Sequence, residues 1–174
     1  MSDLAPALFC LDARVNIVGG DGVRQIEIDE LYTHDPLRPI SLKPDEIITK
    51  ILIPKNEGPS GSGFAKFTMR GGIEFAGVNV GVLLETEHDP VTCKRARITV
   101  GAVSGGPQRA PAVEAFLKGK SLTEDVIKAA SLKIADGLKI VPHHGYSKAY
   151  LAECLKSQVR TALTGATNAI IGAT

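Results

Sequence analysis

The first third of the chain alternates apolar and polar residues at the spacing of β-strands. Two β-prone runs, 13–18 and 23–28, flank the sequence Gly-Gly-Asp-Gly at 19–22, whose glycines provide the positive φ angles that a tight hairpin needs. A third run at 46–53 carries apolar residues at both odd and even positions, which predicts a strand buried on both faces. The pattern therefore predicts a β-rich unit over residues 1–58.

A flexible segment follows, because residues 56–62 are rich in glycine, serine and proline, and we place a boundary between two units there. Beyond it the chain returns to β-prone sequence, with turn-forming residues between the runs. The runs are 63–70, 75–87 and 94–103, and the turn sequences are Gly71-Gly72 and His88-Asp89-Pro90. This order predicts a three-stranded antiparallel sheet.

After the third run the apolar period changes from 2 to about 3.6, which is typical of helices. The pattern predicts a short helix at 112–117, a second that ends near Gly137, and a last helix from about Ser147 to Leu163. Ser121, followed three residues later by Glu124, forms a capping-box pattern at the start of the second helix. Strands first and helices second predict an α+β fold with about three helices on one face of the sheet.

Length and composition agree with a folded protein of this kind. A chain of 174 residues can bury roughly 70% of its unfolded surface. Hydrophobic residues make up 44% and charged residues 22%, which excludes a disordered or low-complexity chain. We expect two small units, 1–58 and 62–165, followed by a flexible tail over 166–174.

Net charge and cysteine content indicate which partners the protein is expected to bind and in which cellular compartment it is expected to lie. The net charge is +1 and the basic residues are interleaved with acidic ones, so we expect no nucleic-acid partner. Cys10, Cys93 and Cys154 lie far apart, which fits neither a disulfide framework nor a Cys-x-x-Cys metal site. We also expect no membrane span and no export signal, since apolar runs stay well short of about 20 residues. These features predict a cytoplasmic protein with reduced thiols.

Few residues suggest chemistry on spacing alone. The segment 19–22 lacks the following helix that a phosphate loop needs, so we interpret it as a turn. A metal at His143-His144 is disfavoured, because adjacent side chains diverge and further ligands at suitable spacing are missing. We expect no catalytic nucleophile. Lys66 lies in the middle of a predicted strand, where spacing alone favours a solvent-facing side chain over an inward one paired with an anion.

Four segments together resemble a known family, and they occur in the family's order from Ser2 to about Leu163. The segments are Ser-Asp-Leu-Ala-Pro at 2–6, Pro-Asp-Glu-Ile-Ile at 44–48 with Ile-Leu-Ile-Pro at 51–54, Gly-Phe-Ala-Lys-Phe at 63–67 with Arg70 and Phe75-Ala76, and Ile-Thr-Val-Gly-Ala-Val at 98–103 with Pro107 and Arg-Ala-Pro at 109–111. The chain is similar in these segments to the C-terminal half of the FAD-binding subunit of molybdenum hydroxylases. That family includes xanthine dehydrogenase, aerobic CO dehydrogenase and 4-hydroxybenzoyl-CoA reductase.

The resemblance implies a part of an oxidoreductase that passes electrons from iron–sulfur clusters through FAD to an acceptor. Residues 1–58 would form the end of the FAD-binding lobe, and residues 62–165 the CO dehydrogenase flavoprotein C-terminal domain. The implied partners are a molybdopterin-binding large subunit, an iron–sulfur small subunit and a separate chain carrying the N-terminal FAD lobe. The glycine-rich pyrophosphate motifs of the family are missing here, so we expect the isolated chain not to retain FAD. The alternative is a non-catalytic docking or assembly module that no longer binds flavin.

The resemblance also assigns site residues. Asp3 matches the family's flavin-contacting aspartate, Ile48 an apolar residue against the ring system, and Lys66 a lysine near the flavin. Arg70 and Glu74 fall on a flavin-proximal loop that modulates access of the acceptor. A carboxylate can accept hydrogen bonds from flavin N–H or hydroxyl groups, and a lysine stabilises negative charge on the reduced ring, so these residue types suit the roles.

Overall fold

The computed structural model describes residues 2–35, 37–70, 74–87, 89 and 91–172. Its first half contains α1 (Leu4–Cys10), β1 (Arg14–Gly19), β2 (Gly22–Glu27), the 3-10 turn η1 (Asp29–Leu31), β3 (Tyr32–Asp35), β4 (Arg38–Ile40) and β5 (Ile47–Leu52). Its second half contains β6 (Ser60–Phe67), β7 (Val78–Thr86), β8 (Cys93–Gly101), β9 (Gln108–Arg109), α2 (Pro111–Leu117), α3 (Glu124–Ser131) and α4 (Lys148–Ile171). The α+β class is confirmed. The predicted turns lie at 71–72, outside the described residues, and at 88–90, of which only Asp89 is described.

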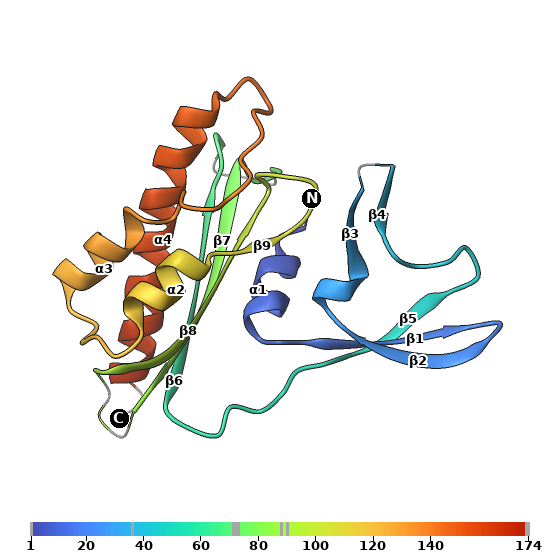
Figure 1. Cartoon of the computed structure of the whole chain (residues 1–174), viewed down its shortest axis with the longest axis horizontal. Coiled ribbons are helices and arrows are strands. Elements are labelled where there is room, and N and C mark those ends of the chain that lie inside the picture. Colours follow the sequence, from blue (N-terminus) through green and yellow to red (C-terminus); the bar gives the residue numbers. More distant parts are fainter. Residues whose placement is uncertain (1, 36, 71–73, 88, 90, 173–174) are drawn as a thin grey trace.

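The first sheet is antiparallel in the order β2-β1-β5. Its hairpin confirms the predicted turn at 19–22, where Gly19 pairs with Gly22, whose φ of 110° suits glycine. One face of the sheet packs on a small core made of Phe9, Ala13, Val15, Ile17, Ile28 and Leu31. The β3–β4 pair lies beside this sheet (Figure 1).

The strand predicted at 46–53 is present as β5, but the prediction that it is buried on both faces is wrong. Ile47 is 65% exposed and Ile51 is 49% exposed, whereas Ile48 is partly buried against the small core. The physical reason is position, because β5 lies at the edge of its sheet and the small core covers only part of one face. In β5, apolar residues at successive positions therefore mark one covered face and one apolar face that the rest of the described chain leaves exposed.

The second sheet is antiparallel in the order β6-β7-β8-β9, which confirms the three predicted strands and adds a short fourth one. Sequence periodicity missed β9 because it has two residues, too few to show a period of 2. The helices α2, α3 and α4 cover one face of this sheet, as predicted (Figure 1). The packing of α4 is close, since a side chain on Gly63 would lie 2.0 Å from the carbonyl oxygen of Ala162.

Three helix boundaries differ from the sequence predictions. The N-cap of α3 is Thr123, whose hydroxyl accepts from the Val126 amide at 3.3 Å, so the capping box based on Ser121 is wrong. Ser121 instead forms a β-bridge with Thr92, and the helix ends at Ser131. The flexible tail predicted over 166–174 is also wrong as far as Ile171, because α4 continues to that residue and buries Ala166 and Ile170 in the core.

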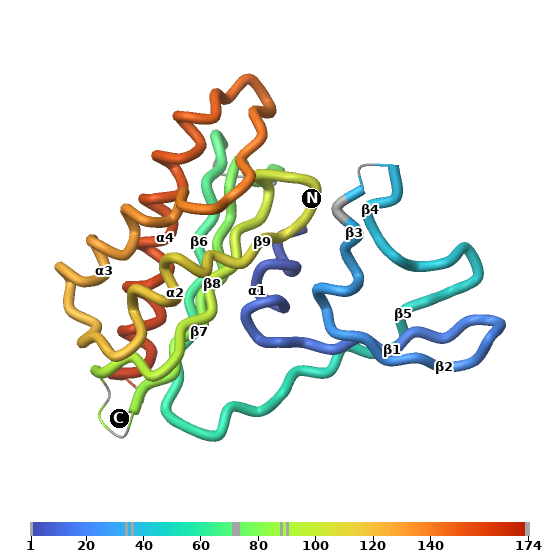
Figure 2. The backbone as a smooth tube through the Cα atoms, in the orientation of Figure 1, coloured from blue at the N-terminus to red at the C-terminus, as the bar shows by residue number. Residues whose placement is uncertain are grey.

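The helix α1, which the sequence analysis did not predict, lies across the face of the second sheet opposite α4. Figure 2 shows this blue helix beside the green strands. Two glycines permit the contact, since a side chain on Gly81 would lie 2.8 Å from the Pro6 carbonyl oxygen and one on Gly101 would lie 2.6 Å from the Pro6 ring. The Cys10 thiol donates to the Gly81 carbonyl at 3.0 Å. The N-terminal segment is thereby placed over the end of β6 and the start of β7.

Candidate functional site

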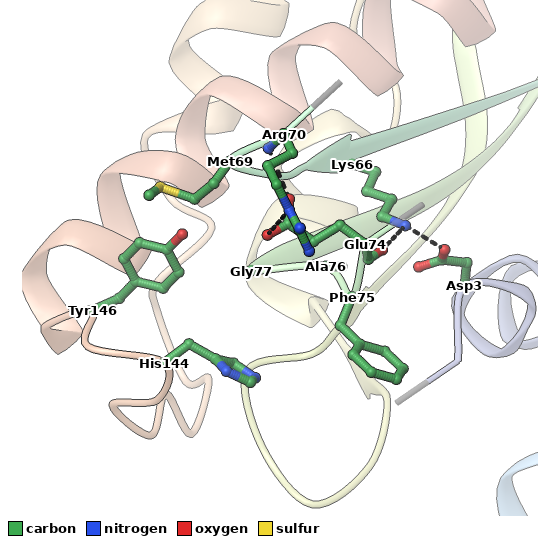
Figure 3. A pocket seen from close by; sticks show the side chains of 10 residues that line it. All are labelled: Asp3, Lys66, Met69, Arg70, Glu74, Phe75, Ala76, Gly77, His144 and Tyr146. Carbon is green, nitrogen blue, oxygen red and sulfur yellow. Dashed lines mark hydrogen bonds and ion pairs between the residues drawn. The ribbon is translucent and has the colours of Figure 1, made fainter. Parts of the chain in front are cut away.

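An open cavity of about 930 Å³ lies where α1 begins, β6 ends and residues 74–77 approach the loop before α4. Its lining includes Asp3, Lys66, Arg70, Glu74, Phe75 and Tyr146 (Figure 3). The cavity thus combines side chains from three parts of the chain that are far apart in the sequence. Four of the five site residues expected from the resemblance meet here.

Lys66 provides a partly buried cationic group of the cavity. It lies on β6 opposite Asn79 of β7, on the sheet face that carries α1. Its Nζ donates to Asp3 Oδ2 at 2.7 Å and to the Glu74 carbonyl oxygen at 2.7 Å, and its side chain is 25% exposed. Spacing alone favoured a solvent-facing lysine, but in the structure Lys66 is partly buried and paired with an anion.

Asp3 provides the anionic group. Its second carboxylate oxygen, Oδ1, accepts from Asn79 Nδ2 at 2.8 Å. Partial burial raises the pKa of Asp3, but the hydrogen bonds from Lys66 and Asn79 outweigh that effect and hold the pKa below its ordinary value. The carboxylate is therefore charged at neutral pH and bridges two neighbouring strands.

Arg70 and Glu74 are brought together at the edge of the cavity. The Arg70 amide donates to Glu74 Oε2 at 2.7 Å, and the Arg70 Nε lies 3.6 Å from Glu74 Oε1. The guanidinium is 75% exposed, so this ion pair is solvated and adds little stability. Both residues line the cavity. That this pair modulates access of the electron acceptor stays a prediction.

Ile48 lies elsewhere. It belongs to β5 in the first sheet, where it packs against the small core and is not among the residues that line the cavity. Its contact with a flavin ring stays a prediction.

Sequence reasoning missed a cluster of aromatic rings of which one member, Tyr146, lines the cavity. Tyr146 stacks on Tyr150 with ring centroids 5.4 Å apart and meets the edge of Phe67 at 5.8 Å. These residues come from the loop before α4, from α4 and from β6, so neither period nor motif could have grouped them. Phe75 also lines the cavity and is 71% exposed, so the rings of Tyr146 and Phe75 offer apolar surface to it.

The paired histidines do not form a metal site in the described part of the chain, where no group of three or more His, Cys, Asp or Glu side chains is placed to hold an ion. The His143 ring nitrogens lie 3.0 Å from the carbonyl oxygens of Val141 and Gly77. His143 therefore ties its loop to the residue that precedes β7, and His144 lines the cavity.

Two of the cysteine thiols, those of Cys10 and Cys93, are poor nucleophiles. Burial raises the pKa of Cys10 to about 11 and the pKa of Cys93 to about 11, so both stay protonated at neutral pH.

Within the described residues, none of the helices combines the length and apolar character that crossing a bilayer requires.

The arrangement suits the edge of a planar, polar heterocycle. Lys66 uses two of its three N–H groups on Asp3 and Glu74, which leaves one donor for a ligand, and Asp3 can accept from a ligand N–H or hydroxyl. Glycine-rich sequence before a long helix, the usual means of holding a pyrophosphate, is not found around this cavity among the described residues. The donors and acceptors present are therefore of the kind that fits one edge of a planar heterocycle such as a flavin ring.

Family models match both halves of the chain. The model described as the CO dehydrogenase flavoprotein C-terminal domain matches residues 64–166. The model described as the FAD binding domain in molybdopterin dehydrogenase matches residues 1–56.

Curated relatives and solved structures are similar to the chain over most of its length. Aldehyde oxidase 4 of Rattus norvegicus is 26% identical over 81% of this chain and 10% of its own length. The nicotinate dehydrogenase FAD-subunit of Eubacterium barkeri is 26% identical over 73% of this chain and 43% of its own. Quinoline 2-oxidoreductase from Pseudomonas putida 86 has the same fold, with a TM-score of 0.84, 22% identity and coverage of 99% of this chain and 57% of that one. The reconstituted CO dehydrogenase from Oligotropha carboxidovorans gives a TM-score of 0.83 at 20% identity, over 96% and 57%. The chain thus spans less than two thirds of each of these proteins.

Proposed function

Because this chain belongs to the CO dehydrogenase flavoprotein C-terminal domain family, we propose that it forms part of the FAD-containing electron-transfer subunit of a molybdopterin-dependent hydroxylase or dehydrogenase. The observation that carries the proposal is the Asp3–Lys66 pair at the cavity beside α1 and β6. Two residues that the resemblance places near the flavin, 63 positions apart in the chain, meet there at 2.7 Å. The nicotinate dehydrogenase FAD-subunit, a relative along 73% of the chain, supports the same role.

The chain's own residues bind and orient one edge of the flavin. Lys66 donates its remaining N–H to an electron-rich atom of the ring, and its charge stabilises negative charge that develops there. Asp3 accepts a hydrogen bond from the ligand while it holds Lys66 in place. When bound, FAD supplies the redox chemistry that takes electrons from the iron–sulfur clusters and passes them to an acceptor.

The rest of the flavin site is proposed to lie in the N-terminal FAD lobe of the family. We propose a molybdopterin-binding large subunit, an iron–sulfur small subunit and a chain that carries the N-terminal FAD lobe. The open side of the first sheet supports such a partner, since Ile47, Ile51 and Ile53 are each about half exposed or more. The cysteines of the chain are free, which agrees with a reducing cytoplasm.

The isolated chain does not retain FAD. A cofactor of this size needs its pyrophosphate held, and the cavity provides only the ring edge. Absorbance spectra of the purified chain, alone and after mixing with a separately produced N-terminal lobe of the family, test this. We expect a colourless chain and a yellow complex.

Two other outcomes are informative. A stoichiometric flavin spectrum from the chain alone would contradict the shared site. A stable complex with the lobe that stays colourless in excess FAD would favour the alternative, a docking or assembly module that no longer binds flavin.

A further inference from the structure

We propose that Asn79 is a positioning residue of this site: its side-chain amide holds the Asp3 carboxylate so that one oxygen faces Lys66 and the cavity. The inference rests on the proposed flavin role of Asp3 and Lys66 and adds a residue that does not line the cavity itself. It begins with strand register, because Lys66, Asn79 and Gly101 form one row across β6, β7 and β8. Their side-chain positions lie on the face that α1 covers.

Hydrogen bonding fixes the direction of the Asn79 amide. Its Nδ2 donates to Asp3 Oδ1 at 2.8 Å and lies 3.3 Å from the Ser2 carbonyl oxygen. Both partners are acceptors, so only the nitrogen can face them. Asn79 therefore contacts the segment that carries Asp3 at two points and leaves Oδ2 for Lys66.

The carbonyl oxygen of the same amide, Asn79 Oδ1, indicates that Asn79 does more than fill space in the core. Asn79 is 1% exposed, and its Oδ1 is buried without a hydrogen-bond partner among the described residues. A buried unpaired carbonyl is unfavourable, and an apolar side chain at this central strand position would avoid that cost. The cost of the unpaired Asn79 oxygen thus accompanies the hydrogen bond that the amide nitrogen donates to Asp3.

Gly101 provides the space for the unpaired oxygen. A side chain at this position of β8 would place its Cβ 2.2 Å from Asn79 Oδ1. Along the row, Lys66 provides a cation, Asn79 an amide and Gly101 the space beside it. The carboxylate of Asp3 bridges Lys66 and Asn79. Asn79 acts through Asp3, because the contacts that it makes toward the cavity go to residues 2 and 3.

The first test uses the full chain without cofactor. The pKa of the Asp3 carboxyl is followed by carbon-13 NMR titration in the parent, Asn79→Ala, Asn79→Asp and Thr99→Val. Loss of the amide donor should raise the pKa of Asp3 in Asn79→Ala, and a second carboxylate at this position should raise it further in Asn79→Asp. Thr99→Val, a buried change on the neighbouring strand β8, should leave it unchanged.

Either Asn79 variant suffices if the other does not fold. An Asp3 pKa equal to that of the parent in a folded Asn79 variant would overturn the inference, whatever happens to flavin binding.

The second test uses the complex with the N-terminal FAD lobe. Asn79→Ala should weaken FAD binding roughly two- to tenfold, the range expected for one hydrogen bond. The double variant with Asp3→Ala should bind no worse than Asp3→Ala alone, because Asn79 acts through Asp3. Additive losses would show that Asn79 affects FAD binding independently of Asp3 and would overturn the inference.

The two proposals fail in distinguishable ways. If Asp3→Ala weakens FAD binding while Asn79→Ala leaves both binding and the Asp3 pKa unchanged, the Asn79 inference fails and the proposed function stands. If the Asp3 pKa responds to Asn79 but Asp3→Ala binds FAD as well as the parent, the flavin role of this edge is wrong.

Discussion

The two sheets of the molecule differ in how completely they are covered. In the described residues the second sheet has α2, α3 and α4 on one face and α1 on the other, and its core contains twenty-five buried apolar residues. The first sheet rests on a core of six, and its edge strand β5 exposes Ile47 and Ile51. We therefore expect the second sheet and its helices to contribute more to the folding free energy than the first sheet, which exposes apolar side chains along β5. The candidate site lies on the well-supported unit, which keeps Lys66 and Asn79 in fixed register.

The contact between α4 and β6 gives the largest expected effect. In Gly63→Ala the new methyl group would lie 2.0 Å from the Ala162 carbonyl oxygen, so the helix must move away from the strand. We expect a loss of about 3 kcal/mol or more in the free energy of unfolding, measured by urea denaturation. The matched control is Gly165→Ala on α4, where the space around the added methyl group is open, and a gain of about 0.5 to 1 kcal/mol is expected. Similar effects from both changes would contradict close packing at this contact.

A core substitution in the first sheet should have a smaller and more local effect. Ile17 is fully buried, but its small, partly open core can relax around a cavity, so Ile17→Ala should cost about 2 kcal/mol. Hydrogen exchange should increase across residues 14–52 and stay near the parent level in β7 and β8. Uniform loss of protection in both sheets would show that the two units unfold as one.

The smallest effect concerns acid sensitivity of the first sheet. Hydrogen bonds from Arg24 and from the Lys43 amide lower the pKa of Glu46 from 4.5 to about 2. A carboxylate with a lowered pKa stabilises the fold above the unfolded-state value, and this contribution is lost as the pH falls from 4.5 to about 2. Glu46→Gln should therefore be less stable than the parent at pH 6, with a difference that narrows toward pH 2. A difference that does not change with pH, measured by thermal unfolding across this range, would contradict the assignment.

The sequence predicted helices and strands whose apolar residues recur at a regular spacing, and it missed features that depend on contacts between distant residues. The long strands β7 and β8 and the start of α4 near Ser147 followed from the spacing of apolar residues. The burial of β5 was wrong because hydrophobicity does not show whether a neighbour is present. Likewise, the end of α4 was missed because Ala166, Thr167 and Ile170 give a weak apolar signal but pack against β6 and β7.

The site shows the same division. Lys66 on spacing alone appeared solvent-facing, and only the family resemblance placed it and Asp3 near one ligand. Their direct contact, and the part that Asn79 plays, depend on how α1 lies on the second sheet, which is set by Gly81 and Gly101. A glycine that permits close approach gives no periodic signal, so such contacts cannot be predicted from one sequence.

The most direct test of the account is a comparison of two lysines in the complex of this chain with the N-terminal FAD lobe. Lys66→Ala removes the cation that faces the cavity, whereas Lys50→Ala removes an exposed one on β5. A charge-assisted contact is worth about 1.5 to 3 kcal/mol, and an exposed lysine about 0.5 kcal/mol. FAD affinity and flavin reduction potential are measured for both variants. We expect Lys66→Ala to weaken FAD binding or shift the potential well beyond Lys50→Ala, and equal affinities with equal potentials would show that the Asp3–Lys66 pair has only a structural role.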